Sequence, residues 1–307
     1  MHLPDYHGGS IVNLMRSIER ALDARPCVAA ADYPESHALP AQALSGARNI
    51  VLLVVDGLGY DYLQGPGAGS TLQRDLRARL SSVFPSTTAT AISSFLTGVG
   101  PQQHALTGWH VWLRELACLA ATLRFRPRHG GDALSKAGIV PRSLYTSEPM
   151  FDRLAAKSHV VSPADIIDSD YNVAHCGLAQ RRPYRDLPGL FSAVAEIVRS
   201  GSERQFIHAY TYAFDETAHS YGSASPELQA KFRDIDTAYA RFVEEIAGSG
   251  TLVLTVADHG FIDSPKRACI ELEDHPQLAQ MLMLPLCGER RVAYCYVQPG
   301  QEAALEH

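Results

Sequence analysis

Three motifs with acidic or imidazole side chains follow apolar runs in this 307-residue chain. Asp56 follows NIVLLVV, Asp258 and His259 follow TLVLTVA, and Asp215 comes shortly after QFIHAY. Asp215 and His219 are four residues apart, so a helix places both side chains on one face. Carboxylate and imidazole together suit Zn²⁺, with Mn²⁺ or Fe as alternatives. The sequence therefore predicts a site for divalent metal built from these five residues.

Each motif also has a purely structural explanation. An aspartate after an apolar strand is often a turn or cap residue, and Asp-x-x-x-His on a helix is often a surface pair. An acid, an imidazole and a glycine at one strand end, as in Asp258-His259-Gly260, is an unusual way to build a turn. The metal hypothesis therefore depends on all three motifs occurring together in one chain.

A fourth motif is rich in hydroxyl groups. FPSTTAT, residues 84–90, leads into a helix of small residues predicted over 88–97 and closed by Gly98. Backbone N–H groups and the macrodipole at the start of a helix favour anions. A hydroxyl there is placed to bind phosphate or to act as a nucleophile, and helix capping by serine or threonine is the competing explanation.

The elements that must position these groups alternate between strands and helices. Apolar runs predict strands over 49–55, 82–84, 205–210, 251–256 and 292–297, of which 49–55 and 251–256 are apolar on both faces. Helical spacing predicts helices over 10–24, 71–80, 190–199 and 226–247. This alternation indicates an α/β fold, with a mostly parallel central sheet and helices on both faces. In such sheets, functional groups gather beyond the carboxyl ends of the strands.

The stretch 108–185 is less regular, and mixes short apolar segments with proline, glycine and basic residues. We interpret it as a smaller cap or insertion within a single α/β domain spanning 1–307. The formal charge of −6 argues against binding to a nucleic acid duplex. The six cysteines include no C-x-x-C pair, and we see no signal peptide or membrane-spanning run. We therefore expect a cytoplasmic protein that has no membrane partner.

In their order along the chain, the motifs VVDG, FPSTTAT, LTG, Asp-x-x-x-His-x-x-Gly and ADHG resemble those of the alkaline phosphatase superfamily. The resemblance is strongest to its type I phosphodiesterase/nucleotide pyrophosphatase branch. It runs from PDYHGGSIVNLMRSI near the start to PLCGERRVAYCYV near the end. It implies a metal-dependent hydrolase of phosphate esters, whose substrate is a small-molecule phosphate ester or a nucleotide.

The resemblance also implies a role for each motif residue. It implies two divalent metal ions, zinc with manganese as the alternative. The first metal is held by Asp56, Thr88, Asp258 and His259, and the second by Asp215 and His219. Thr88 matches the threonine of the family's F-P-[ST]-x-T pattern, which makes it the expected nucleophile and the site of a covalent phosphothreonine intermediate. Thr87 is the nearest competitor for this role.

Two features depart from the family's pattern. The asparagine that helps bind phosphate, three residues after the nucleophile, is replaced here by Ala91. The family completes its second metal with a late histidine, and no matching motif occurs before the chain ends at His307. His129 and His275 are the alternatives for that ligand. The expectation is a C-terminally truncated form whose second site is weaker.

Other functions fit the same residues. The chain is alternatively a phosphomonoesterase, phosphonate hydrolase or mutase of the same superfamily, which relative rates on phosphate monoesters and diesters distinguish. A non-catalytic metal- or phosphate-binding protein is the alternative from another class, which metal content measured together with turnover distinguishes. Trp109, Tyr212 and Phe214 are candidates for stacking on a base or aryl group, with burial in the core as the other explanation.

Overall fold

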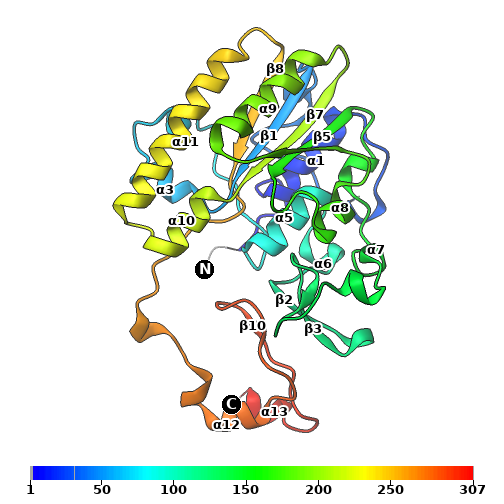
Figure 1. Cartoon of the computed structure of the whole chain (residues 1–307), viewed down its shortest axis with the longest axis vertical. Coiled ribbons are helices and arrows are strands. Elements are labelled where there is room, and N and C mark those ends of the chain that lie inside the picture. Colours follow the sequence, from blue (N-terminus) through cyan, green and yellow to red (C-terminus); the bar gives the residue numbers. More distant parts are fainter. Residues whose placement is uncertain (1–2, 31, 307) are drawn as a thin grey trace.

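A parallel five-stranded sheet forms the centre of the computed structural model, which describes residues 3–30 and 32–306 (Figure 1). The strand order is β6-β5-β7-β1-β8, and every neighbouring pair is parallel. The strands are β1 (Asn49–Val55), β5 (Lys157–Pro163), β6 (Gln180–Tyr184), β7 (Gln205–Thr211) and β8 (Thr251–Val256). This arrangement confirms the α/β class and the parallel sheet that the sequence predicts.

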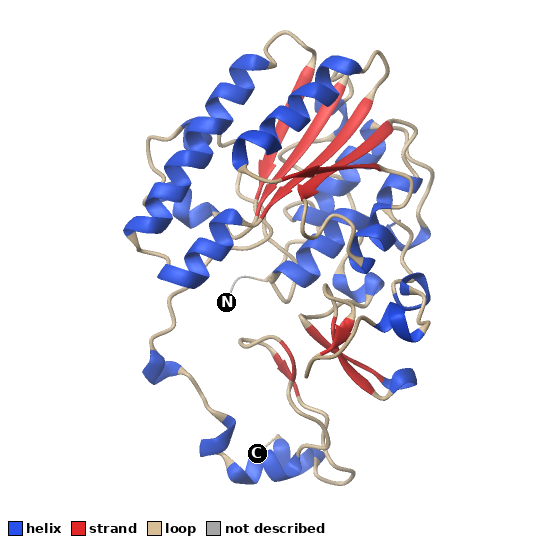
Figure 2. Cartoon of the chain, viewed as in Figure 1, coloured by secondary structure: helices blue, strands red, loops and turns tan. Residues whose placement is uncertain are grey.

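Helices cover both faces of this sheet (Figure 2). One face carries α1 (Ile11–Ala21), α5 (Thr88–Thr97) and α8 (Asp170–Cys176). The other carries α9 (Leu187–Ser200), α10 (Ala213–Tyr221) and α11 (Pro226–Glu245). Alternate residues of β1 enter the two cores, so that Leu52 packs on the first face and Leu53 on the second. Burial on both faces explains why β1 reads as a continuous apolar run.

Shorter elements complete the chain. The short helices are α2 (Ala41–Leu44), α3 (Tyr60–Gln64), α4 (Thr71–Arg74), α6 (Pro101–His104), α7 (Pro141–Leu144), α12 (Pro276–Met281) and α13 (Glu302–Leu305). Turns of 3-10 helix lie at Val28–Ala30, Arg114–Leu116, Leu134–Ala137, Met150–Asp152, Lys266–Ala268 and Leu272–Asp274. Among the residues that the structure describes, no helix combines the length and apolar character needed to cross a membrane.

A second sheet joins two distant parts of the chain. It is antiparallel and has the order β10-β9-β2-β3-β4. Its strands are β2 (His110–Leu113), β3 (Cys118–Ala121), β4 (Arg126–Pro127), β9 (Cys287–Gly288) and β10 (Ala293–Tyr294). The last two come from the C-terminal segment, which Figure 1 shows in orange and red away from the main sheet. The hairpin of β9 and β10 thus returns from that segment to the middle of the molecule.

The range 108–185 predicted for the cap is too wide. Its second part supplies β5 and β6 to the main sheet, whereas β2, β3 and β4 form the second sheet. β6 has the sequence QRRPY, and all but its last residue are exposed. Edge strands tolerate such polar residues and proline, so the strand has no apolar periodicity to detect.

Other predicted elements also differ from the structure. The helix predicted over 71–80 ends at Arg74, after a single turn whose one buried residue is Leu72. Residues 82–84 form no strand. The strand predicted over 292–297 is limited to β10 and belongs to the second sheet. β8 is half-buried rather than buried, because it is an edge strand of the main sheet.

Candidate active site

The carboxyl ends of β1, β7 and β8 bring the predicted acidic residues together. Asp56 directly follows β1, Asp258 lies two residues after β8, and Asp215 is in the first turn of α10, after β7. β1 lies between β7 and β8 with all three strands parallel, so their ends meet at one edge of the sheet. Asp56 and Asp258 are almost completely buried, with 1% and 0% of their surface exposed.

The two buried aspartates each use one carboxylate oxygen for the fold. Asp56 Oδ2 accepts a hydrogen bond of 2.6 Å from the Tyr210 hydroxyl. Asp258 Oδ1 accepts from the backbone N–H groups of Gly57 and His259, at 3.0 and 2.9 Å. The remaining oxygens face His259, whose Nε2 lies 3.3 Å from Asp56 Oδ1 and 3.5 Å from Asp258 Oδ2. Each side chain therefore directs one ligand atom toward a common point.

This cluster has the donors and the electrostatics of a site for divalent metal. Asp56, Asp258 and His259 each offer a ligand atom, and these atoms lie within 4.8 Å of one another. Asp258 Oδ2 is buried and has no hydrogen-bond partner among the described residues. Burial and the charge of Asp258 raise the pKa of Asp56 to about 8. Two carboxylates excluded from water repel one another and favour a bound cation, so the residues fit the predicted metal.

His259 is held between these acids. Burial by itself lowers the pKa of the imidazole, but the charge of Asp258 and the hydrogen bond and charge of Asp56 outweigh burial and raise that pKa to about 10. The imidazole ring therefore lies in a strongly negative electrostatic potential. The same potential attracts a divalent metal, which takes the imidazole as a neutral ligand.

Thr88, and not Thr87, faces the acidic cluster. Thr88 is the first residue of α5, and its Oγ1 lies 3.1 Å from His259 Nε2 and 3.5 Å from Asp56 Oδ1. The Thr87 hydroxyl points elsewhere and donates a hydrogen bond of 2.9 Å to Glu289 Oε1. The N–H groups of the first turn of α5 leave this end of the helix suited to an anion. The geometry thus places the Thr88 hydroxyl beside the acidic cluster, at the N-terminus of α5.

Asp215 and His219 form a pair beside the cluster. Both lie on α10, four residues apart, and His219 Nε2 is 3.4 Å from Asp215 Oδ1. The same oxygen of Asp215 is 3.9 Å from His259 Nε2, so the pair adjoins the first three ligands. Burial raises the pKa of Asp215, while 71% of the His219 side chain is exposed. The pair therefore forms an open, surface-facing position.

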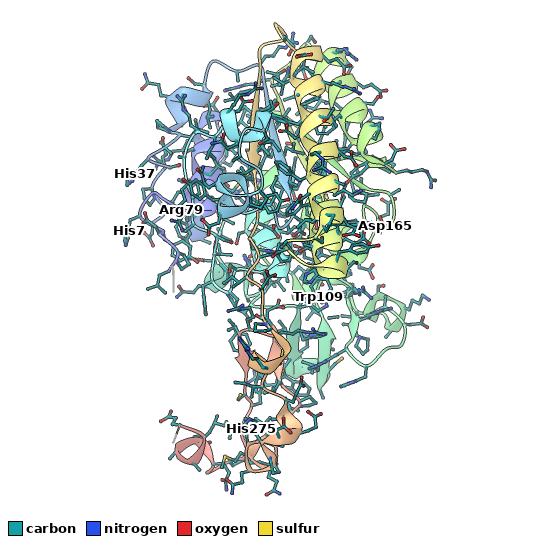
Figure 3. The ribbon with its side chains drawn as sticks, turned by 90° about the vertical axis from the view of Figure 1, so that its left-hand side faces the viewer. His7, His37, Arg79, Trp109, Asp165 and His275 are labelled. Carbon is teal, nitrogen blue, oxygen red and sulfur yellow. The ribbon has the colours of Figure 1, made fainter. Side chains whose placement is uncertain are left out.

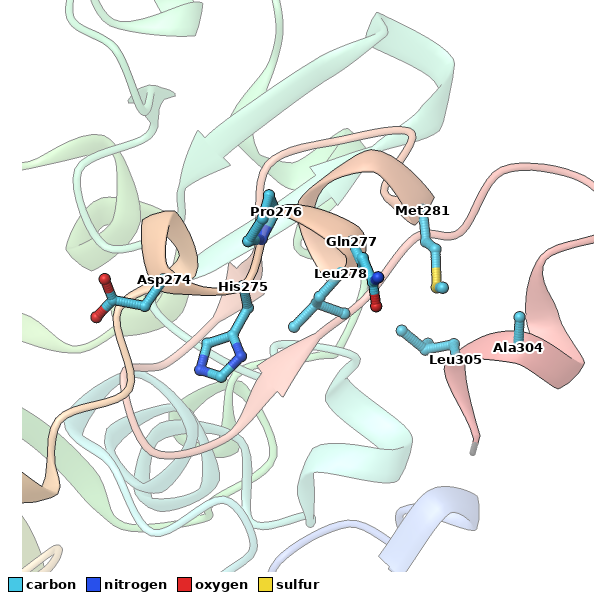
Figure 4. Close-up of a pocket in the computed structure, with 8 residues that line it drawn as sticks. All are labelled: Asp274, His275, Pro276, Gln277, Leu278, Met281, Ala304 and Leu305. Carbon is cyan, nitrogen blue, oxygen red and sulfur yellow. The ribbon is translucent and has the colours of Figure 1, made fainter.

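Neither alternative histidine reaches this pair. Figure 3 shows His275 in the C-terminal segment, on the far side of Trp109 from the main sheet. It lies in a cavity of about 470 Å³, lined by residues 274–278, 281, 304 and 305 of that segment (Figure 4). His129 is an exposed residue that follows β4 in the second sheet. Among the described residues, the metal cluster of three ligands contains neither histidine.

Comparison with known proteins agrees with the motif pattern. A family model described as type I phosphodiesterase / nucleotide pyrophosphatase matches residues 50–306. The chain belongs to this family. It is accordingly a phosphoric ester hydrolase of the alkaline phosphatase superfamily, as the resemblance predicts. The family depends on divalent metals, and the Asp/His cluster is the corresponding candidate site. A search of curated proteins found no match.

Solved structures share the fold at low sequence identity. Murine ectonucleotide pyrophosphatase / phosphodiesterase 5, as an inactive threonine-to-alanine variant in complex with AMP, has a TM-score of 0.60 and 15% identity over 83% of this chain and 68% of its own. Human ectonucleotide pyrophosphatase / phosphodiesterase 5 has a TM-score of 0.60 and 16% sequence identity, with the same coverage of both chains. Phosphonoacetate hydrolase from Sinorhizobium meliloti 1021 in complex with phosphonoacetate has a TM-score of 0.50 and 16% identity, over 70% of this chain and 57% of its own.

Two residues at the site were not predicted from the sequence. Tyr210 pairs with Val54 in the register of β7 and β1, which places its hydroxyl against Asp56. Burial and the charge of Asp56 raise the pKa of Tyr210 above its ordinary value, so its hydroxyl remains a donor. Aligning the two predicted strands 49–55 and 205–210 in parallel would have placed Tyr210 next to the end of β1. Glu289 has no such indication, because it lies in a charged turn between β9 and β10.

The aromatic candidates separate into core and surface. Phe214 is fully buried and packs edge-on against Tyr62, with ring centroids 4.9 Å apart, so it belongs to the core and offers no stacking surface. Trp109 and Tyr212 are half-buried. The Tyr212 hydroxyl donates to Asp165 at 3.0 Å. These two residues remain candidates for contact with a leaving group.

A large cleft reaches the site from the side of β8. Its volume is about 1520 Å³, and Asp258 and His259 form part of its lining. Residues of β8 and Tyr60 and Arg79 line other parts of it. The cleft therefore adjoins the acidic cluster at Asp258 and His259.

Proposed function

We propose that this chain is a metal-dependent phosphodiesterase of the nucleotide pyrophosphatase type, with Thr88 as its nucleophile. The observation that carries the proposal is the position of Thr88 Oγ1, which lies 3.1 Å from His259 Nε2 at the N-terminus of α5. A hydroxyl there adjoins both a cluster of buried acids and a helix end that favours phosphate. Family membership supports the same reaction class.

The proposal assigns two positions to divalent metal, Zn²⁺ or Mn²⁺. The three-ligand position consists of Asp56, Asp258 and His259, with Thr88 as a further ligand, and the two-ligand position consists of Asp215 and His219. Bound metals would supply positive charge that favours the deprotonated threonine hydroxyl and offsets charge developing on the phosphoryl oxygens. Tyr210 and the backbone N–H of Gly57 hold the aspartates in orientation for this purpose.

The reaction proceeds by two in-line displacements. Thr88 loses its hydroxyl proton, its Oγ forms a bond to phosphorus, and the bond from phosphorus to the leaving alcohol oxygen breaks. The departing alkoxide takes up a proton, and a phosphothreonine intermediate remains. A water molecule then loses a proton and attacks phosphorus from the opposite side, the bond to Thr88 Oγ breaks, Thr88 Oγ takes up a proton, and a phosphate monoester is released. The N–H groups of the first turn of α5 stabilise the phosphoryl oxygens in both steps.

The substrate is proposed to be a small phosphodiester or nucleotide. AMP bound to the murine structure is a nucleoside monophosphate, the kind of product that such a reaction releases. Ala91, at the position of the family's phosphate-binding asparagine, is fully buried within α5. Phosphate binding at this site must therefore use the helix N-terminus and groups from other elements. Trp109 and Tyr212 are the proposed contacts for the leaving group.

The test compares three substrates on metal-free and reconstituted protein. Activity on bis-(p-nitrophenyl) phosphate should disappear after exhaustive chelation and return with Zn²⁺ or Mn²⁺. It should exceed activity on p-nitrophenyl phosphate and on phosphonoacetate. Full activity in protein whose metal content is confirmed as zero would contradict the metal-dependent mechanism. Faster cleavage of the monoester or the phosphonate would favour the corresponding alternative, and metal binding without turnover would indicate a binding protein.

A further inference from the structure

Glu289 lies at the start of the nucleophile's helix although it is 30 residues beyond His259 in the sequence. Its Oε1 accepts a hydrogen bond of 2.9 Å from the Thr87 hydroxyl and one of 2.5 Å from the backbone N–H of Trp109. Thr87 immediately precedes Thr88. A carboxylate is therefore held one residue away from the proposed nucleophile, where neither the motif pattern nor the family match assigns a function.

The second sheet holds Glu289 in this place. Glu289 directly follows β9, and Gly288 of β9 pairs with His110 of β2. The two chains approach so closely that a Cβ on Gly108 would lie 2.8 Å from Gly288 Cα. The hydroxyl of Tyr294 on β10 also donates to the Thr107 carbonyl at 3.2 Å. The position of Glu289 is thus set by backbone pairing on both sides, and not by a flexible surface turn.

A negative charge on Glu289 opposes the binding of an anionic substrate at this site. The N-terminus of α5 favours anions, and a phosphate substrate must approach it. Glu289 is half-buried, so water screens its charge incompletely. Burial raises the pKa of Glu289, while Thr87, Trp109 and the charge of His259 lower it. The hydrogen bond from Thr87 holds Glu289 beside the start of α5, and the next residue, Thr88, contacts His259 of the acidic cluster at 3.1 Å.

We propose that Glu289 is a specificity-determining residue whose charge selects phosphodiesters, which carry one negative charge, over phosphomonoesters, which carry two. The inference rests on the proposed function and deepens it. A monoester at pH 8 has lost its second proton, since the pKa of that proton is about 6, whereas a diester remains singly charged. The additional charge is placed near a fixed carboxylate, and such a like-charge contact discriminates against the wrong ligand. The positive charge supplied at the metal positions would attract the doubly charged monoester more strongly than the diester, and the carboxylate opposes that preference.

Glu289→Gln tests the role of charge with little change of shape. Glutamine retains an oxygen that accepts from Thr87 and Trp109, but it is neutral. With zinc-loaded protein at pH 8, the ratio of kcat/KM for p-nitrophenyl phosphate to that for bis-(p-nitrophenyl) phosphate should rise roughly tenfold. Glu289→Asp keeps the charge and should keep the wild-type ratio. Glu273→Gln, an exposed glutamate of the same C-terminal segment, is the matched control and should also leave the ratio unchanged.

Two further readouts distinguish charge from a structural role. At pH 5 the monoester AMP is mostly singly charged, so the effect of Glu289→Gln on AMP binding in a Thr88→Ala background should largely vanish. In a Thr88→Ala background at pH 8, Glu289→Gln should tighten AMP roughly tenfold and leave 3′,5′-cyclic AMP, a singly charged diester, unchanged. This binding comparison does not depend on turnover, so it remains decisive if the proposed function fails.

The outcomes separate the two ideas. If metal-loaded protein that retains Thr88 cleaves none of the esters, and Glu289→Gln still tightens AMP roughly tenfold in the Thr88→Ala background, the proposed function is overturned and the role of Glu289 is supported. Equal losses on both substrates, an unchanged ratio, or binding of neither nucleotide to either variant would overturn the role of Glu289.

Discussion

Replacing Thr88 by alanine should abolish turnover while leaving the fold and the metals in place. Thr88 is half-buried at the first position of α5, and within the described part of the chain its hydroxyl has polar contacts only with His259 and Asp56, at 3.1 and 3.5 Å. Alanine has a higher helix propensity than threonine, so the free energy of unfolding should change by less than about 1 kcal/mol. Removal of a catalytic nucleophile, in contrast, lowers kcat by a factor of about 10⁴–10⁶.

Thr87→Ala is the matched comparison, because the two threonines are adjacent and differ in what they contact. Thr87 loses a hydrogen bond to a carboxylate, Glu289, which contributes about 1.5–3 kcal/mol. If all of that acted on the transition state, kcat would fall by no more than about 150-fold, far less than for the loss of the nucleophile. Thr88→Ser keeps a hydroxyl at the same position and should retain measurable turnover.

The assay measures kcat on bis-(p-nitrophenyl) phosphate at saturating Zn²⁺ and pH 8 for the four proteins. Metal content and thermal unfolding are measured on the same samples, so that loss of activity can be separated from loss of metal or fold. Wild type should also yield a phosphorylated peptide containing Thr88 after rapid acid quenching. If Thr87→Ala abolishes turnover and Thr88→Ala does not, the nucleophile is assigned to the wrong threonine.

The remaining predictions concern metal affinity, packing and acid stability. Calorimetric titration of metal-free protein with Zn²⁺ should show one tight site and a second site that binds at least about tenfold more weakly. The reason is that the first position has three protein ligands and the second has two. Two equally tight sites would contradict this prediction. Gly59→Ala would put a Cβ 2.7 Å from Gly260 Cα, next to the metal ligands, and should lower the Zn²⁺ affinity of the tight site about tenfold or more. Gly46→Ala is the control, because a Cβ there meets no described atom within 4 Å, and it should leave that affinity unchanged. Equal losses of Zn²⁺ affinity in the two variants would refute the packing argument. Burial lowers the pKa of His208 from 6.5 to about 4, so the unfolded chain takes up this proton first as the pH falls. Stability should therefore decrease by up to about 3 kcal/mol from pH 6.5 to pH 4, and His208→Leu should flatten urea-unfolding free energies in that window; an unchanged slope would count against the assignment.

The sequence by itself was sufficient for the elements that carry the chemistry. β1 is apolar on both faces and is buried on both, and its end places Asp56 at the sheet's edge, as predicted. The helix of small residues runs from Thr88 to Thr97 and is capped by Gly98, as its capping pattern predicts. These predictions succeed because burial of a strand and capping of a helix leave local patterns of residue type. The order of the motifs then sufficed to indicate the family.

Only the tertiary structure decided which strands border the sheet and which groups surround the nucleophile. β6 is polar because it lies at an edge, and β8 is half-exposed for the same reason, although its sequence resembles that of β1. Thr87 and Thr88 are indistinguishable by type, and they differ because one faces Glu289 and the other faces His259. Contacts of this kind join residues more than 170 positions apart. Such pairing leaves no periodic pattern along the chain, because it depends on how complete elements pack against one another.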